Sequence, residues 1–205
     1  MKTKDKIIYK AIEMYNNLGI TNVSSRNIST ELGISHGNLE YHFKTKSILL
    51  NAIYSKMSEG IAPVYEDPDT HEDLLVHFQN LLSELEKLQQ TYLFFNLDIM
   101  EISRKFPEVK NKLDDTLFLR KRQTSVIIKN LIESNNFKEE PFEGCYLRLQ
   151  HTIRILITFW KSQEEILVSF PSLKKDEMSL HIWSLLIPHL TDKGMYTYVS
   201  LIKNR

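Results

Sequence analysis

The stretch Ser24–Lys46 reads S-S-R-N-I-S-T-E-L-G-I-S-H-G-N-L-E-Y-H-F-K-T-K and contains two short helical patterns separated by a sharp turn. In the first pattern, Ser24 or Ser25 suits the N-cap of a helix. Ile28 and Leu32 are four positions apart, so they share one face of that helix. This half of the stretch therefore predicts a helix of roughly two turns with one apolar face.

The second half of the stretch predicts another short helix after a tight turn. Gly33 follows Leu32 directly, at a place where a chain leaving a helix often needs a left-handed residue. Ser35 supplies a second N-cap, and Leu39 and Phe43 give the second helix its own apolar pair. Two such helices joined by a short turn that contains glycine form a helix-turn-helix.

The polar positions of this helix-turn-helix are suited to DNA. The second helix is expected to turn short or flat donors and acceptors outward, and an asparagine can bridge the N6 and N7 atoms of adenine. The flanking cations suit phosphate contacts, and the exposed amides of a helix that begins near Thr45 are expected to face a phosphate as well. An ordinary polar helical hairpin is the alternative interpretation. The predicted DNA contacts are Ser24, Ser25, Arg26, Ser35, His36, Asn38, Tyr41, His42, Lys44 and Lys46.

Residues 1–50 resemble the N-terminal domain of the TetR family of bacterial transcription regulators. The matching run is I-S-x-x-L-G-I-S-x-G-N-L-x-Y-H-F-K-x-K-x-x-L, from Ile28 to Leu49, and a helical pattern that ends at Gly19 precedes it. The resemblance implies a homodimeric repressor with three N-terminal DNA-binding helices and an all-helical remainder that binds a ligand and dimerises. Glu40 departs from the family pattern, which commonly has an aromatic residue there to grip the phosphate backbone. A carboxylate pointing at a phosphate would repel it.

The composition is that of an ordinary globular chain, with 205 residues, of which 42% are hydrophobic and 25% charged. The single cysteine, Cys145, cannot form an internal disulfide, which fits a reducing compartment. The sequence contains no apolar run of about 18 residues and no apolar signal core. We therefore expect a cytoplasmic protein.

Formal charge is zero overall but is distributed unevenly. Residues 1–56 carry eight Lys or Arg against four Asp or Glu, for a net charge of +4, and the remainder carries −4. This asymmetry places a positive field on the expected DNA-binding part. The basic triplet Arg120-Lys121-Arg122 has no recognition motif around it and is expected to be a solvated helix face.

Helical periodicity continues through the rest of the chain, and no segment alternates with a period of two for long. The predicted fold class is all-α, with an N-terminal three-helix helix-turn-helix domain over residues 1–50 and a helical ligand-binding and dimerisation domain over residues 51–205. We expect the boundary inside the helix that starts near Thr45, and a loop near residues 62–70. Helices are expected at about 3–18, 45–61, 71–90, 92–102, 107–134, 142–165, 175–190 and 192–203.

The resemblance places a dimer interface on the expected helices 142–165 and 175–190, whose apolar residues occupy more than one face. A monomer that buries both faces internally is the alternative. The resemblance also implies a ligand pocket, for which we expect an apolar or aromatic ligand, with His151 or Arg154 available to an acidic group. Most of the candidate residues are also expected to serve as core. They are Phe78, Phe94, Phe95, Met100, Phe118, Tyr146, His151 and Arg154.

Catalytic and metal-binding classes have no support in the sequence. It contains no G-x-S-x-G, no P-loop, no dinucleotide fingerprint and no H-E-x-x-H spacing, so we expect neither an enzyme nor a metal or other cofactor. The predicted function is a homodimeric repressor that binds a palindromic operator through two recognition helices about 34–36 Å apart and is released by a small molecule. A helical ligand-binding or interaction protein with a degenerate DNA-binding head is the alternative that Glu40 leaves open.

Overall fold

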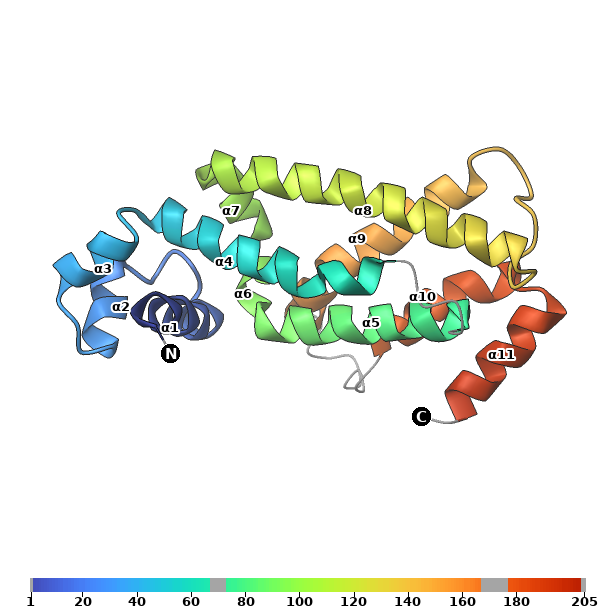
Figure 1. Ribbon diagram of the computed structural model, residues 1–205, viewed down its shortest axis with the longest axis horizontal. Helices are drawn as coiled ribbons and strands as arrows, with labels where there is room; N and C mark the ends of the chain where they lie inside the picture. Colours follow the sequence, from blue (N-terminus) through green and yellow to red (C-terminus); the bar gives the residue numbers. More distant parts are fainter. Residues whose placement is uncertain (1, 67–72, 167–176, 204–205) are drawn as a thin grey trace. The chain divides into compact units, whose positions relative to one another are not determined.

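The computed structural model describes residues 2–66, 73–166 and 177–203, which form helices joined by turns and short loops (Figure 1). Within these ranges there is no strand, and one isolated bridge pairs Phe137 with Leu190. The predicted all-α fold class is confirmed. By its contacts the chain divides into two compact units, unit 1 (residues 1–60 and 88–116) and unit 2 (residues 61–87 and 117–205).

Unit 1 contains the helix-turn-helix and also a segment from much later in the chain. The first helix has the predicted bounds, and its buried residues lie on one face as the 3.6-residue period requires. The helices that contribute to unit 1 are α1 (Thr3–Leu18), α2 (Ser25–Glu31), α3 (His36–His42), α4 (Lys46–Ile61) as far as Gly60, the end of α5 (Leu74–Thr91) from Leu88, α6 (Leu93–Leu97), α7 (Ile99–Lys105) and the first part of α8 (Pro107–Glu133).

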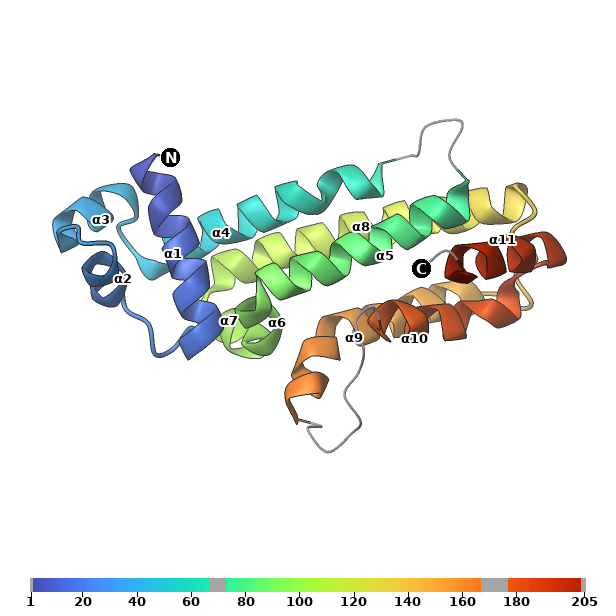
Figure 2. The same cartoon turned by 90° about the horizontal axis from the view of Figure 1, so that it is seen from below.

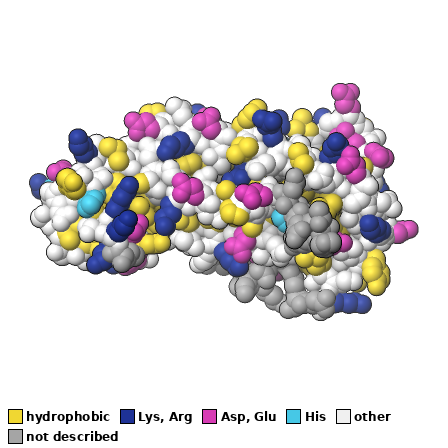
Figure 3. Space-filling view, viewed as in Figure 1, with side chains coloured by type: hydrophobic (Ala, Val, Ile, Leu, Met, Phe, Trp, Pro, Cys, Tyr) yellow, Lys and Arg dark blue, Asp and Glu magenta, His cyan; other side chains and the backbone are white. Residues whose placement is uncertain are grey.

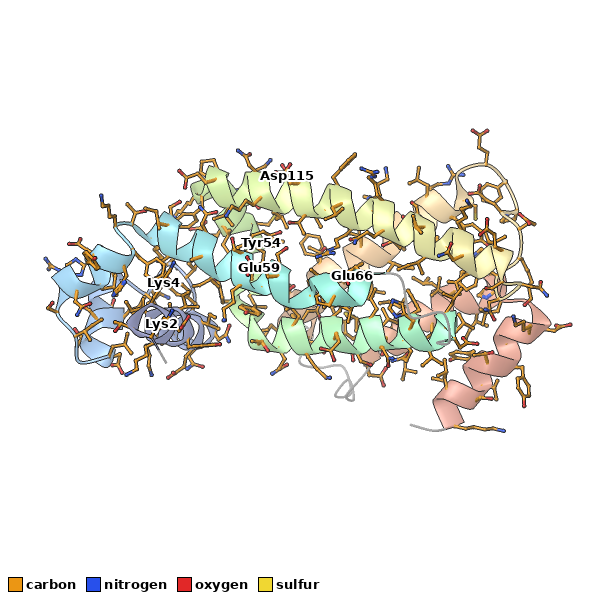
Figure 4. The ribbon with its side chains drawn as sticks, in the orientation of Figure 1. Lys2, Lys4, Tyr54, Glu59, Glu66 and Asp115 are labelled. Atoms are coloured by element: carbon orange, nitrogen blue, oxygen red, sulfur yellow. The ribbon has the colours of Figure 1, made fainter. Side chains whose placement is uncertain are left out.

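The core of unit 1 joins these segments through aromatic contacts. The ring of Tyr15 in α1 lies 5.2 Å from that of Phe94 in α6, and Tyr54 in α4 lies 5.4 Å from Phe95. Figure 4 labels Tyr54 on α4, and Figures 1 and 2 both place α6 beside the C-terminal end of α1. The three N-terminal helices therefore share one hydrophobic core with α4, α6 and α7.

The prediction of a single helix over residues 92–102 is wrong, because the structure divides this segment into α6 and α7. Asp98 lies at the break with φ −98° and ψ 13°. Its carboxylate accepts a hydrogen bond from the backbone N–H of Ile20, at 2.8 Å. The apolar run is therefore interrupted where a polar side chain has a partner in a distant turn.

Unit 2 is built around a buried tryptophan. Trp183 donates from Nε1 to Oε1 of Gln79 at 2.7 Å, and its ring contacts those of Phe78 and Tyr198. A buried indole with its N–H satisfied has no unpaired polar group to oppose folding. The elements of unit 2 are η1 (Ala62–Tyr65), α5 (Leu74–Thr91) as far as Lys87, α8 from Leu117, α9 (Cys145–Ile166), α10 (Glu177–Leu186), η2 (Ile187–His189) and α11 (Asp192–Lys203).

Most predicted helices are found close to their expected bounds. The helix expected over 175–190 ends as an α-helix at Leu186 and continues as the short 3-10 segment η2, which contains Pro188. Residues 62–65 of the predicted loop form η1, whereas its later part lies outside the described residues. None of the described helices is long and apolar enough to cross a membrane.

Candidate nucleic-acid interface

Two serine caps begin the helices of the helix-turn-helix, as the sequence predicts. Ser24 Oγ accepts a hydrogen bond from the N–H of Asn27 at 3.2 Å, and Asn27 Oδ1 accepts from the N–H of Ser24 at 2.9 Å, which completes a capping box. Ser35 Oγ accepts from the N–H of Asn38 at 3.1 Å. Between the helices, Gly33 has φ +64°, the left-handed conformation that glycine adopts without strain.

The packing of α3 determines which of its residues face solvent. Leu39 and the following Phe43 are buried beneath the helix, so at 100° per residue the opposite face is centred on Gly37 and Tyr41. Tyr41 is 84% exposed, and Asn38 is exposed beside it. This face therefore offers a phenol and an amide to a partner that docks on α3.

The other predicted DNA contacts surround this face. Ser24, Ser35, Arg26 and Lys44 are exposed at the ends of the two helices, whereas Ser25, His36 and His42 are partly buried. Figure 3 shows Lys and Arg side chains interspersed with hydrophobic ones over the α1–α3 region. At the start of α1, Lys4 lies with its ammonium 5.7 Å from the ring centroid of Phe43 (Figure 4).

Glu40, the residue that departs from the family pattern, is paired within α3. Its Oε1 atom lies 3.2 Å from Nε2 of His36, one helical turn earlier, and both side chains are partly exposed. The pair lies on the flank of the exposed face that Tyr41 and Gly37 define. The carboxylate is therefore directed along the helix toward His36, which gives it a partner other than DNA.

Lys46 does not have the position expected of a phosphate contact. Its ammonium is directed into unit 1, donates to the carbonyl oxygens of Ile20 and Val23, and lies 5.4 Å from the ring centroid of Tyr15. Burial lowers its pKa, and the nearby Lys105 lowers it further. Hydrogen bonds to two backbone carbonyls occupy this cation, so the position of its ammonium does not support the expected phosphate contact.

The candidate ligand residues are divided between the two units. Phe94, Phe95 and Met100 belong to unit 1, where the two phenylalanines are core and Met100 is 54% exposed. The others belong to unit 2. There Phe78 packs on Trp183, the Tyr146 hydroxyl donates to the carbonyl of Lys138 at 2.8 Å, Phe118 and His151 are exposed, and Arg154 is partly buried.

Arg120 was expected on a solvated face, but its side chain is buried. Its guanidinium lies 4.2 Å from the ring centroid of Tyr65 and donates to Oε1 of Gln123 at 2.8 Å. Burial raises the pKa of Tyr65, while the charges of Arg120 and Arg154 lower it. Two guanidinium groups therefore act on one hydroxyl in unit 2. Lys121 and Arg122 are exposed, as expected for the rest of the triplet.

Sequence reasoning also missed Asn16 and Asp98, which link α1 and the following turn to residues 91–98. Asn16 Oδ1 accepts from the N–H of Phe94 at 2.9 Å, and its Nδ2 donates to the carbonyl of Thr91 at 3.0 Å. The available signal was polar residues within otherwise apolar segments, such as Asp98 in the run L-F-F-N-L-D-I. No group of His, Cys, Asp or Glu within the described ranges is arranged to hold a metal ion.

The fold and the exposed face of α3 define a helix-turn-helix DNA-binding regulator, and comparisons with known proteins identify its family. Residues 56–198 match the profile of the TetR family, described as "Bacterial transcriptional repressor". The chain belongs to this family. It is a transcriptional regulator and not an enzyme.

Solved structures and one curated relative agree with this assignment. A TetR-family transcriptional regulator from Marinobacter aquaeolei VT8 superposes with a TM-score of 0.89 at 22% identity, over 100% of this chain and 98% of that one. The "putative transcriptional regulator" from Saccharomonospora viridis, solved in complex with choline, superposes with a TM-score of 0.69 at 18% identity, over 89% of this chain and 94% of that one. The "Probable HTH-type transcriptional regulator YttP" of Bacillus subtilis is 32% identical over 66 residues, which span about a third (32%) of the length of each protein.

Proposed function

We propose that this regulator is a homodimeric repressor that binds a palindromic operator and releases it when a small molecule binds. The observation that carries the proposal is the exposed face of α3, where Tyr41 and Asn38 stand free of the core. A recognition helix places such an exposed face in the major groove, where its side chains contact base edges. Because the protein acts on DNA, we also place it in the cytoplasm.

The proposed DNA contacts fall into two kinds. Asn38 and Tyr41, with His36 and His42 at the flanks, are proposed to meet base edges and the groove wall. The exposed ends of the helices, with Ser24, Ser25, Ser35, Arg26 and Lys44, are proposed to meet phosphates. Lys46 supports this surface from inside and is not proposed to touch DNA through its ammonium.

A homodimer is supported by an apolar stripe on α9. Leu147, Ile155 and Phe159 are 44–49% exposed and are spaced by multiples of four, so they share one helix face. On α10, in contrast, the exposed residues are the polar His181 and Ser184. We therefore propose that α9 contributes more of the predicted interface than α10 does.

The effector is proposed to bind in unit 2, outside the helix-turn-helix. Tyr65, with the guanidinium groups of Arg120 and Arg154 acting on it, supports an effector that has an acidic group and an apolar or aromatic body. The choline in the Saccharomonospora viridis structure belongs to that protein. Choline is a cation, so the acidic effector proposed for this protein would carry the opposite charge.

Selection of binding sequences from a random DNA library by the purified protein tests the proposal. The expected product is an inverted repeat, and Asn38→Ala should relax the preference at one or two positions of each half-site, at a cost of about 1–3 kcal/mol for the preferred base. Asn111→Ala is the matched control, because Asn111 is exposed on α8, outside α2 and α3, and should change nothing. If the wild-type protein enriches no sequence at low salt, the proposed operator binding is wrong.

A further inference from the structure

The backbone of Ile20 is held on both sides of its Cα. Ile20 lies in the turn between α1 and α2 and is buried. Its N–H donates to Oδ2 of Asp98 at 2.8 Å, and its carbonyl accepts from the ammonium of Lys46. Because the backbone N–H and the backbone carbonyl of Ile20, which belong to two successive peptide groups, both have charged partners, the turn is fixed more strongly than by neutral hydrogen bonds alone.

The same ammonium extends the grip to the next residues of the turn. Lys46 Nζ donates to the carbonyl of Val23 at 2.7 Å, and Ser24, the N-cap of α2, follows Val23 directly. The place where α2 begins is therefore set by contacts that end one residue before its cap. Since α2 and α3 are packed together, the position of this turn also sets the position of the exposed face of α3.

Asp98 is a distant contributor to this arrangement. It lies 78 positions after Ile20, at the break between α6 and α7, and it is outside the N-terminal segment that resembles a DNA-binding domain. Its charge also favours the protonated form of Lys46, against the burial that lowers the pKa of that ammonium. The carboxylate thus supports both backbone contacts of Ile20, the N–H by a hydrogen bond and the carbonyl through its charge effect on Lys46.

We propose that Asp98 is a positioning residue for DNA recognition, which acts by holding the Ile20 N–H and thereby the turn from which the α2–α3 pair begins. The proposal rests on the proposed function, since it requires that α3 binds DNA. Asp98 itself does not touch DNA in this proposal. Its role is to keep the exposed face of α3 in one orientation relative to α1.

Electrostatics alone and a positioning role predict opposite changes in DNA affinity when the Asp98 carboxylate is removed. DNA is a polyanion, so the removal of a carboxylate from the unit that binds it should leave affinity unchanged or raise it. A positioning role predicts weaker binding instead, because a displaced α3 makes fewer phosphate and base contacts. The direction of the change therefore separates the two explanations.

The experiment compares Asp98→Ala and Asp98→Asn with wild-type protein on the DNA sequence that the wild type selects, over a range of KCl concentrations. Asp98→Ala is expected to weaken binding about tenfold, and Asp98→Asn, which keeps a neutral acceptor, about threefold. The slope of log affinity against log salt should become shallower, because phosphate contacts are lost. Glu101→Ala and Glu101→Gln are the matched controls, since Glu101 is in α7 and pairs with Lys105 at the surface. They should bind at least as tightly as wild type.

The salt slope distinguishes positioning from a loss of folded protein. A smaller folded fraction lowers affinity by the same factor at every salt concentration and leaves the slope unchanged, an outcome that would overturn the proposal. Binding by Asp98→Ala as tight as that of wild type would also overturn it. If Asp98→Ala does not fold, Asp98→Asn against Glu101→Gln decides by the same criteria. Failure of the wild type to select any sequence would count against the proposed function itself.

Discussion

The ammonium of Lys46 lies 2.7 Å from the carbonyl oxygen of Val23 and also donates to that of Ile20. A lysine in the first turn of a helix that follows a recognition helix has the sequence context of a phosphate contact. In this protein the cation instead closes the turn between α1 and α2. The consequence is that Lys46 stabilises the turn before α2, whereas Lys44 is exposed, as Arg26 is, and we propose these two cations for phosphate contacts.

Lys46→Met is expected to lower the free energy of unfolding by about 2 kcal/mol. The methionine keeps much of the apolar stem but leaves two buried carbonyl groups without their charged donor. Thermal or urea unfolding of the DNA-free protein measures the change. Lys44→Met, at an exposed position two residues earlier, should change stability by less than about 0.5 kcal/mol.

Lys46→Met is expected to cost more stability than Lys44→Met, but the order should reverse for the salt dependence of DNA binding. Lys44→Met is expected to reduce the slope of log affinity against log salt by about one, because it removes one phosphate contact. Lys46→Met, assayed well below its unfolding transition, is expected to lose less of that slope than Lys44→Met does. A larger loss for Lys46→Met would mean that its ammonium leaves the turn to bind phosphate.

Two glycines of the helix-turn-helix should respond to alanine with opposite signs. Gly33→Ala is expected to destabilise the protein by about 1 kcal/mol, because residue 33 has φ +64° and a Cβ is strained there whatever the space. Gly37→Ala is expected to stabilise it by about 0.5 kcal/mol, since Gly37 is helical and a Cβ would meet nothing within 4 Å. Chemical unfolding without DNA compares the pair, and equal effects would contradict this explanation.

The parts of the fold that the sequence predicted are those governed by local chemistry. Ser24 and Ser35 cap helices because a serine before a helical pattern satisfies an amide two or three residues later. Gly33 adopts the left-handed conformation because the turn after α2 requires it. The serine caps and the conformation of Gly33 follow from residues within a few positions of one another. The same is true of the buried apolar face of α1.

The parts that could not be predicted depend on partners distant in sequence. Whether Lys46 meets a phosphate or the carbonyl of Val23 depends on how α4 packs against the turn 23 positions earlier. The break at Asp98 depends on the N–H of Ile20, and the burial of Arg120 on the ring of Tyr65. Helical periodicity alone contains no information about which side chain closes which turn.

Gly194→Ala should be among the most destabilising single-methyl additions in this chain. A Cβ on Gly194 would lie 2.1 Å from the backbone oxygen of Asn136, so α11 must move away from the 134–137 turn to accommodate it. Overpacking of this kind costs about 1–3 kcal/mol. Gly60→Ala in α4 is the control, because nothing lies within 4 Å of its Cβ, and it should leave stability unchanged or slightly higher. Comparable losses for the two variants, measured by calorimetry, would rule out the close approach at Asn136.

Ile155→Asp and Phe159→Asp are expected to convert the protein from a dimer of its 24.1 kDa chain to a monomer. Both side chains belong to the exposed apolar stripe of α9. In a two-fold interface each substitution occurs twice and buries two carboxylates, which costs several kcal/mol without a counter-charge. Light scattering coupled to gel filtration measures the mass, and Leu18→Asp is the control, because Leu18 is 53% exposed at the end of α1, outside the stripe.

The monomeric variants should also lose affinity for the inverted repeat far more than for a single half-site, because linked half-sites bind cooperatively only through a dimer. A wild-type mass of one chain would exclude the homodimer, and dimers that persist in both α9 variants would place the interface on another face.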